Sequence, residues 1–576
     1  MRSVRALPRA AVLVALTLAA VEARAAGPPS LWPDLESWWS EPGNPAQTPD
    51  GWLGIPFPRS LAGLVRGSWT LETPGRAPEA LPWPGVLAAR RPAVWYDSVR
   101  AGAPAGGDWG GPDAGLAEVQ GLRRTPVERR ARSVFSLASG DFGTDAYGLG
   151  FERGDSLKWL RAEAATARRG PVGALGLAGS HVWGASGGLV RGRHRFEAAY
   201  TERGSAGELR EALAAEAAAG ESGEIGWRYL EAHTTLGLRL MRGHDHHESF
   251  DNSFGTVLPY SRRDAQENRA VIVAEHATAA GLLGARLDWR QGAVRRSDDP
   301  TFDVRGNTWW GAGAFQRRVM DGRLRLEVGG GRLGGLGRSA WAPRASYAFG
   351  AGAVQGQVFA ARLITPVWTD LASGQAAFLQ RTWAGGFELL ARPASRVNAH
   401  TSLLIGLTRD RALLVRYPLE DVWLRVGTTA DPERYGFGLA ELGLDWRAGG
   451  LGAGTSGYVL WRDVSALQPR VDPGTGVRAY GEYRCAAFQR DLGIAVRGEI
   501  EGVGVREGEF SNRRLPEYLS FGGSMTMTLA DATVTLRARN LENRRREEVW
   551  VDPVSGVEAL GPGREFRFML SWRLFD

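Results

Sequence analysis

The chain has 576 residues, a formal net charge of +7 and a hydrophobic fraction of 43%. It holds 78 glycines together with 22 tryptophans, 20 phenylalanines and 12 tyrosines, and this aromatic content excludes a globally disordered chain. The basic residues are arginines apart from Lys158, and they alternate with acids, so no nucleic-acid partner is expected. A single cysteine, Cys485, excludes an internal disulfide framework.

The first 25 residues have the pattern of a secretory signal peptide. Three arginines precede an apolar run from Ala10 to Val21, and a cleavage-like site ends at Ala25. That run is too short for a stable span, and no later stretch approaches the roughly 20 apolar residues that a membrane helix requires. The pattern predicts export without a helical anchor.

Residues 26–130 are irregular and rich in proline and glycine, and they indicate no strand. Near residue 131 the sequence changes to alternating segments of about ten residues, separated by turn-forming residues. This change predicts three parts: a signal peptide at 1–25, an irregular segment at 26–130 and a barrel at 131–576.

Alternation of apolar and polar residues is the main signal in the third part. In residues 323–328, leucine and valine occupy one face of a predicted strand, and arginine and glutamate occupy the other. The same pattern recurs in residues 283–290, 492–499, 524–529 and 533–539. A soluble half-buried sheet has this period too, so the alternation alone does not establish a membrane protein.

The number of such segments decides between the two readings. About twenty can be marked, and open sheets of that size usually split or curl. We therefore predict an all-β fold, a large transmembrane antiparallel β-barrel of about 20 to 22 strands, each spanning with roughly 9 to 11 residues. The alanine-rich residues 208–221 fit either a short helix or a strand pair.

The last predicted strand, residues 565–574, has the clearest alternation. One face carries Phe566, Phe568, Leu570, Trp572 and Leu574. Such a C-terminal strand resembles the signal that the outer-membrane barrel assembly machinery reads, which makes that machinery and the lipid of the cell outer membrane expected partners.

Segments upstream of this strand resemble one family, the TonB-dependent receptors. The segments that carry the resemblance are Leu515-Pro516-Glu517-Tyr518, Arg539-Asn540-Leu541, Gly561-Pro562-Gly563-Arg564, Ala342-Pro343-Arg344, and Arg362 to Leu371 followed by Gly386-Phe387-Glu388. The resemblance covers roughly the last 240 residues well. It implies a protein of the Gram-negative outer membrane that takes up a small solute, with the TonB energy-transducing complex as a partner.

The N-terminal part departs from that family. Its members carry a plug that is longer than residues 26–130 and that begins with an energy-coupling box, which this sequence lacks. Residues 26–130 are therefore expected to form either a reduced plug or an irregular periplasmic or lumenal extension.

Two glycine-containing segments match enzyme motifs, but the structure predicted around each of them does not fit the motif. Residues 184–188 match the G-x-S-x-G nucleophile elbow, but the following residues 189–201 predict a strand where the motif needs a helix. Gly329, Gly331 and Gly334 match a dinucleotide motif, which also needs a following helix. We expect no enzyme, no catalytic residue and no cofactor; glycines here give room to aromatic residues of neighbouring strands.

The run from His244 to Glu248 is the one candidate ligand site. Its imidazoles and carboxylates are ligands that Zn²⁺ or another divalent ion accepts, so His244, His246 and His247 are the candidate metal ligands. The alternative is a solvated loop that follows a strand at residues 234–241.

The sequence thus predicts an outer-membrane transport protein. Its alternatives are a passive porin-like channel and a surface-binding barrel that transports nothing. The polar strand faces combine arginine with glutamate, which predicts a lumen wall of mixed charge with a weak anion preference. The solute stays unknown, because specificity in such barrels depends on loop contacts.

Overall fold

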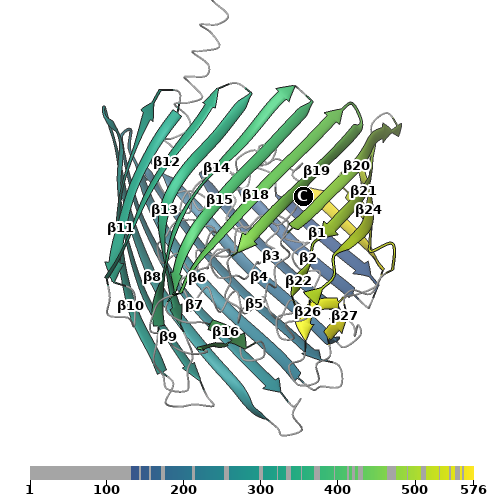
Figure 1. The fold of residues 1–576 in the computed structure, drawn as a ribbon, viewed down its shortest axis with the longest axis horizontal. Helices are drawn as coiled ribbons and strands as arrows, with labels where there is room; N and C mark the ends of the chain where they lie inside the picture. Colours follow the sequence, from purple (N-terminus) through teal and green to yellow (C-terminus); the bar gives the residue numbers. More distant parts are fainter. Residues whose placement is uncertain are drawn as a thin grey trace, which may run out of the picture.

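The computed structural model describes residues 131–575, apart from short segments at several connections between strands. The predicted signal peptide and the segment at 26–130 lie outside the described residues. Within the described part, 22 strands form one sheet in which each barrel strand pairs with the next along the chain (Figure 1). The first strand, β1 (Arg132–Gly140), also pairs with the last, β28 (Glu565–Phe575), so the sheet closes into a barrel.

The strands between these two ends of the sheet are antiparallel to their neighbours. They are β2 (Thr144–Gly154), β3 (Lys158–Arg169), β4 (Leu175–Arg191), β5 (His194–Leu209), β6 (Ala214–Leu230), β7 (Thr234–Asp251), β8 (Leu258–Thr278), β9 (Gly281–Arg296), β10 (Asp303–Val319), β11 (Gly322–Arg332), β12 (Ser339–Ala351), β13 (Val354–Trp368), β14 (Ala377–Ala394), β15 (Val397–Asp410), β18 (Glu433–Ala448), β19 (Leu451–Arg462), β20 (Thr475–Ala487), β21 (Leu492–Val503), β24 (Tyr518–Leu529) and β25 (Ala532–Arg539).

The two rims of the barrel differ in the length of their connections. One rim has tight turns such as residues 192–193 and 449–450, where Gly192 and Gly449 adopt φ values of +60° and +59°. The other rim carries long connections that contain three hairpins, seen in the lower part of Figure 1: β16 (Leu414–Tyr417) with β17 (Val422–Arg425), β22 (Arg506–Glu507) with β23 (Arg514–Leu515), and β26 (Glu547–Val551) with β27 (Glu558–Leu560). Outer-membrane barrels have short periplasmic turns and longer extracellular loops, so we expect the long-loop rim to face outward from the cell.

The two faces of the wall differ in chemistry as the alternation predicts. On β18, Leu442 and Leu444 are 67% and 48% exposed. Asp445, the next residue after Leu444, points to the opposite face and is only 4% exposed. The outer face is therefore the apolar, lipid-facing one. Aromatic pairs lie toward the loop side of this apolar band, with ring centroids 5.1 Å apart for Trp183 and Tyr200 and 6.0 Å apart for Trp289 and Trp309.

Strand length is where the prediction is wrong. Strands β4 to β10 have between 16 and 21 residues, well beyond the expected ten. They are longer because they continue past the apolar band toward the loop rim. The alanine-rich residues 208–221 belong to this region: Glu208 pairs with Ala215 in a strand pair, and the helix alternative is wrong.

Glycine makes room for aromatic rings on neighbouring strands, as expected. A Cβ atom at Gly329 of β11 would lie 2.7 Å from Nε1 of Trp310 on β10, whose side chain is 4% exposed. Only glycine lets this indole pack against the adjacent backbone. The described part of the chain contains no helix with the length and apolar composition of a membrane span.

The assignment of the lipid face makes a testable prediction at Leu442. Its partner Gly457 and the neighbouring Leu444 place it in the apolar band, so Leu442→Arg exposes a charge to hydrocarbon. We expect a loss of about 2 to 4 kcal/mol in the free energy of unfolding in lipid vesicles, measured by urea titration. Leu442→Met is the control and should change little; equal stability of the two variants would contradict the assignment.

Candidate functional site

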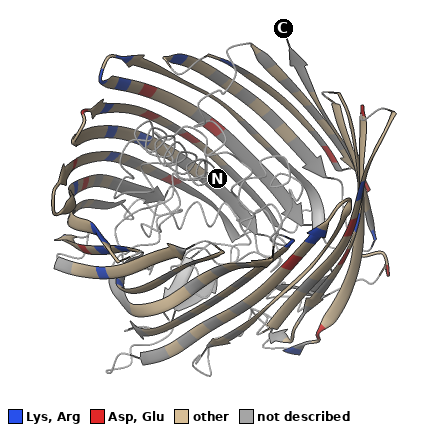
Figure 2. Ribbon diagram, turned by 90° about the horizontal axis from the view of Figure 1, so that it is seen from above, with Lys and Arg blue, Asp and Glu red and all other residues tan. Residues whose placement is uncertain are grey.

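The inner wall of the barrel concentrates the buried charged side chains of the described residues. They alternate with the lipid-facing residues of the same strands, so each strand contributes to the lumen at every second position. Figure 2 shows basic and acidic positions on neighbouring strands around the barrel. The best-packed group spans β5 to β9.

Asp288 of β9 is the centre of this group. Its side chain is 1% exposed, and its two carboxylate oxygens accept hydrogen bonds from Nε and Nη2 of Arg269 on β8, the first at 2.9 Å. Arg286, two residues away on the same strand face, donates from Nη2 to the same carboxylate at 3.2 Å. One carboxylate thus joins two guanidinium groups from neighbouring strands.

Two more ion pairs continue this group across β5, β6 and β7. Arg239 donates from Nε to Glu224 at 3.1 Å, and both side chains are more than nine-tenths buried. Arg195 donates from Nε to Glu197, which lies on the same face of β5. Nη2 of Arg239 donates to the same oxygen of Glu224, so that oxygen accepts two charge-assisted hydrogen bonds.

Further charged pairs line the inner wall on β11 and on β21. Nη2 of Arg325 lies 2.7 Å from Glu327, and Nε of Arg497 lies 2.8 Å from Glu499. The Arg497 guanidinium also stacks 4.0 Å from the ring centre of Tyr480.

Tyr480 in turn donates its hydroxyl to Asp445, whose carboxylate also lies 3.4 Å from Nε of Arg447. The expected lumen wall of mixed charge is therefore what the described residues form. Such a wall can attract and guide polar or ionic solutes.

The predicted histidine site lies on the outer wall and belongs to a strand. The expectation of a loop after residue 241 is wrong, because β7 continues to Asp251. His244 and His246 share the face of β7 that carries the exposed Leu240, and they lie beyond it toward the loop rim. They follow the exposed Leu236 and Leu240 on this face, so we expect the hydrocarbon region to end near them.

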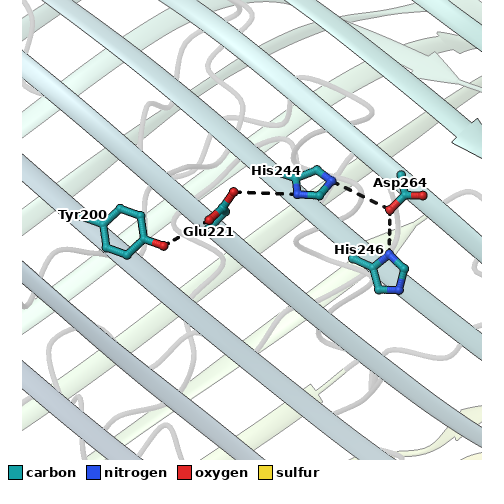
Figure 3. Close-up of polar contacts among 5 residues, drawn as sticks. All are labelled: Tyr200, Glu221, His244, His246 and Asp264. Atoms are coloured by element: carbon teal, nitrogen blue, oxygen red, sulfur yellow. Dashed lines mark hydrogen bonds and ion pairs between the residues drawn. The ribbon is translucent and has the colours of Figure 1, made fainter.

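Five side chains from four strands form a polar chain at this level, which we call the histidine cluster: Tyr200, Glu221, His244, Asp264 and His246 (Figure 3). Tyr200 donates its hydroxyl to Glu221 at 3.1 Å, and the other oxygen of Glu221 lies 4.0 Å from Nδ1 of His244. Oδ1 of Asp264 is 3.8 Å from Nε2 of His244 and 2.7 Å from Nδ1 of His246.

This arrangement does not by itself hold a metal. No group of three or more His, Cys, Asp or Glu side chains among the described residues converges on a metal position. The side chain of His247 is not described. Metal binding by His244, His246 and His247 stays a prediction, which titration of the purified protein with Zn²⁺ would test.

The sequence alone did not predict that the two carboxylates Glu221 and Asp264 belong to the histidine cluster. Glu221 and Asp264 come from β6 and β8, which flank β7 in the sheet, and pair with His244 and His246, respectively. Alternation predicts which residues share a face of one strand, but not which residues of the next strand lie beside them. Only the register brings the cluster together.

The rejected enzyme motif also lies in a strand. Residues 184–188 belong to β4, where Gly184 pairs with Thr201 of β5, and no helix follows. The single strand expected at residues 189–201 is wrong, because the tight turn at residues 192–193 divides this segment between the end of β4 and the start of β5.

Comparison with known proteins supports the fold at low sequence identity. The FrpB iron transporter from Neisseria meningitidis matches with a TM-score of 0.62 and 12% identity over 78% of this chain and 82% of that one. The copper transporter OprC matches at 0.65 and 14% over the same shares. The siderophore receptor PirA from Acinetobacter baumannii matches at 0.61 and 8%, over 78% and 81%.

No model of a protein family matches the sequence, and no curated protein is significantly similar. The similarity is therefore one of structure. The chain has the barrel fold of the TonB-dependent receptors, as its C-terminal segments predict.

The buried ion pairs make a prediction about stability. Asp288→Ala leaves Arg269 and Arg286 without their shared carboxylate, and removal of one partner from a buried pair costs about 3 to 5 kcal/mol. We expect that loss in urea unfolding of the refolded barrel. The matched control is Glu231→Ala, because Glu231 pairs with Arg193 at the turn rim with both side chains over two-fifths exposed; its loss should stay below about 1 kcal/mol.

Proposed function

We propose that this protein is an outer-membrane transporter that moves a small polar solute through the lumen of its barrel. The observation that carries this proposal is the closed sheet of 22 strands with a charged inner wall. A surface-binding protein needs only its loops for binding, and it does not require charged side chains on the lumen wall. A hydrophobic solute would be excluded by the same wall.

The comparisons favour active uptake over passive diffusion. The matched proteins are described as transporters of iron and copper and as a siderophore receptor. For this chain we propose coupling to the TonB energy-transducing complex, export by the signal peptide at residues 1–25 and insertion by the barrel assembly machinery. We assign no enzymatic reaction and no particular solute.

Residues 26–130 have a role in this proposal as a reduced plug. A lumen lined by fixed charges conducts ions unless something controls it. A segment that restricts the lumen and opens on coupling would convert a passive channel into a gated transporter.

The proposal makes a prediction about ion conductance. In planar bilayers, the full chain should conduct little, and a variant lacking residues 28–128 should form stable open channels, because only the plug blocks the lumen. Any ion preference of the open channels should be weak, because arginines and acids pair with one another along the described inner wall. The measurement is single-channel conductance with the reversal potential in a salt gradient.

The other outcomes separate the alternatives. Large conductance of the full chain would favour the passive porin-like channel. Absence of conductance in both forms would favour the surface-binding barrel. Capture of the full chain by the immobilised periplasmic domain of TonB supports energy coupling, and failure of capture under the same conditions contradicts it.

A further inference from the structure

The lipid-facing wall carries an open groove across β3 to β7. Its volume is about 590 Å³, and almost all of its lining is apolar. Small residues make its floor, and larger ones make its sides. The lipid-facing residues that line it are Leu160, Ala185, Gly187, Ala198, Tyr200, Gly223, Ile225, Leu240 and Arg242.

The groove arises from the register of the strands. Gly187 of β4 pairs with Ala198 of β5, and Ala185 of β4 pairs with Tyr200, which pairs in turn with Gly223 of β6. Small side chains on adjacent strands therefore lie together, where the alternation elsewhere places leucine and other large apolar groups. The lipid-facing surface therefore has little side-chain volume across several neighbouring strands.

The space next to Gly223, at the floor of the groove, is empty of protein atoms. A Cβ atom built there would meet only the Tyr200 ring, at 4.0 Å. The glycine is therefore not required by a neighbouring aromatic ring, unlike Gly329 beneath Trp310. This hollow is available to a ligand.

One end of the groove reaches the headgroup level. The Tyr200 hydroxyl bonds Glu221 of the histidine cluster, and aromatic side chains with a polar tip mark the membrane interface (Figure 3). The strands run from this level toward the long-loop rim, so the interface here belongs to the outer leaflet.

Arg242 gives that end a positive charge. It pairs with Gly223 in register, its side chain is exposed, and it makes no hydrogen bond or ion pair with the part of the chain that the structure describes. Glu221, the nearest acid of the cluster, is held by Tyr200 and lies toward His244. A guanidinium at this level matches a phosphate group, which accepts two parallel hydrogen bonds from it.

We propose that this groove binds lipid A, the phosphorylated glycolipid of the outer leaflet. One acyl chain lies over Gly187, Ala198 and Gly223, and a phosphate of the headgroup pairs with Arg242. The apolar groove and the charge at its outer-leaflet end together select a lipid with an anionic headgroup. The site lies on the opposite face of the wall from the lumen, so it is independent of solute passage.

The test compares lipid retained by full-length protein purified from outer membranes in a nonionic detergent. Mass spectrometry measures lipid A per barrel for the unchanged chain, Gly223→Leu, which fills the groove, and Arg242→Gln, which removes the charge. We expect each substitution to lower lipid A retention about tenfold. Heat-dependent gel mobility checks that each barrel is closed.

Matched controls come from the same wall. Gly481→Leu adds the same side chain at a glycine with nothing within 4 Å of its Cβ position, and Arg317→Gln removes an exposed arginine near the turn rim. Both should retain lipid A as the unchanged chain does.

Two results would overturn the proposal. One is unchanged lipid A retention in Arg242→Gln, a surface substitution that does not depend on tolerance of a larger side chain in the groove. The other is retention of added phosphatidylglycerol equal to that of lipid A, which would mean that the groove holds any anionic lipid.

Discussion

Closure of the backbone hydrogen-bond ladder is the constraint on which the rest of this structure depends. A strand edge in hydrocarbon leaves N–H and C=O groups without partners, and each such group costs several kcal/mol. The pairing of β1 with β28 removes both edges, with residues 132–140 matched to residues 567–575. Because that pairing joins the two ends of the described chain, the barrel is complete only when its last strand is in place.

Closure separates the wall into two surfaces with different requirements. The outer surface contacts the hydrocarbon of the lipid, so the exposed side chains of Leu442 and Ile225 stay out of water there. The inner surface can keep charge because carboxylates there lie beside guanidinium groups, as Asp288 does with Arg269 and Arg286. The same side-chain alternation thus yields an apolar surface toward lipid on one side of the wall and a charged surface toward the lumen on the other.

The sequence predicted those features that depend on one strand at a time. Alternation is local, so the faces of residues 323–328 and the closing strand were predictable, and the number of segments predicted closure. Features that depend on the register were not. Glu221 and His244 are 23 positions apart in sequence and become neighbours only because β6 and β7 pair as they do. The length of the strands was not predicted either, because the polar residues that extend them beyond the lipid band have a composition typical of loops.

The groove beneath Tyr200 belongs to the same class of hidden feature. Taken one at a time in the sequence, Gly187, Ala198 and Gly223 indicate only strand residues of low β-propensity. They form a hollow because two consecutive strand pairings, β4 with β5 and β5 with β6, bring them to one place on the lipid-facing wall. A barrel wall that needed only to exclude water would gain from large apolar groups there, and Gly223 has room for one. The small residues, with an exposed arginine at the headgroup end, therefore argue for a specific lipid in the place of those groups.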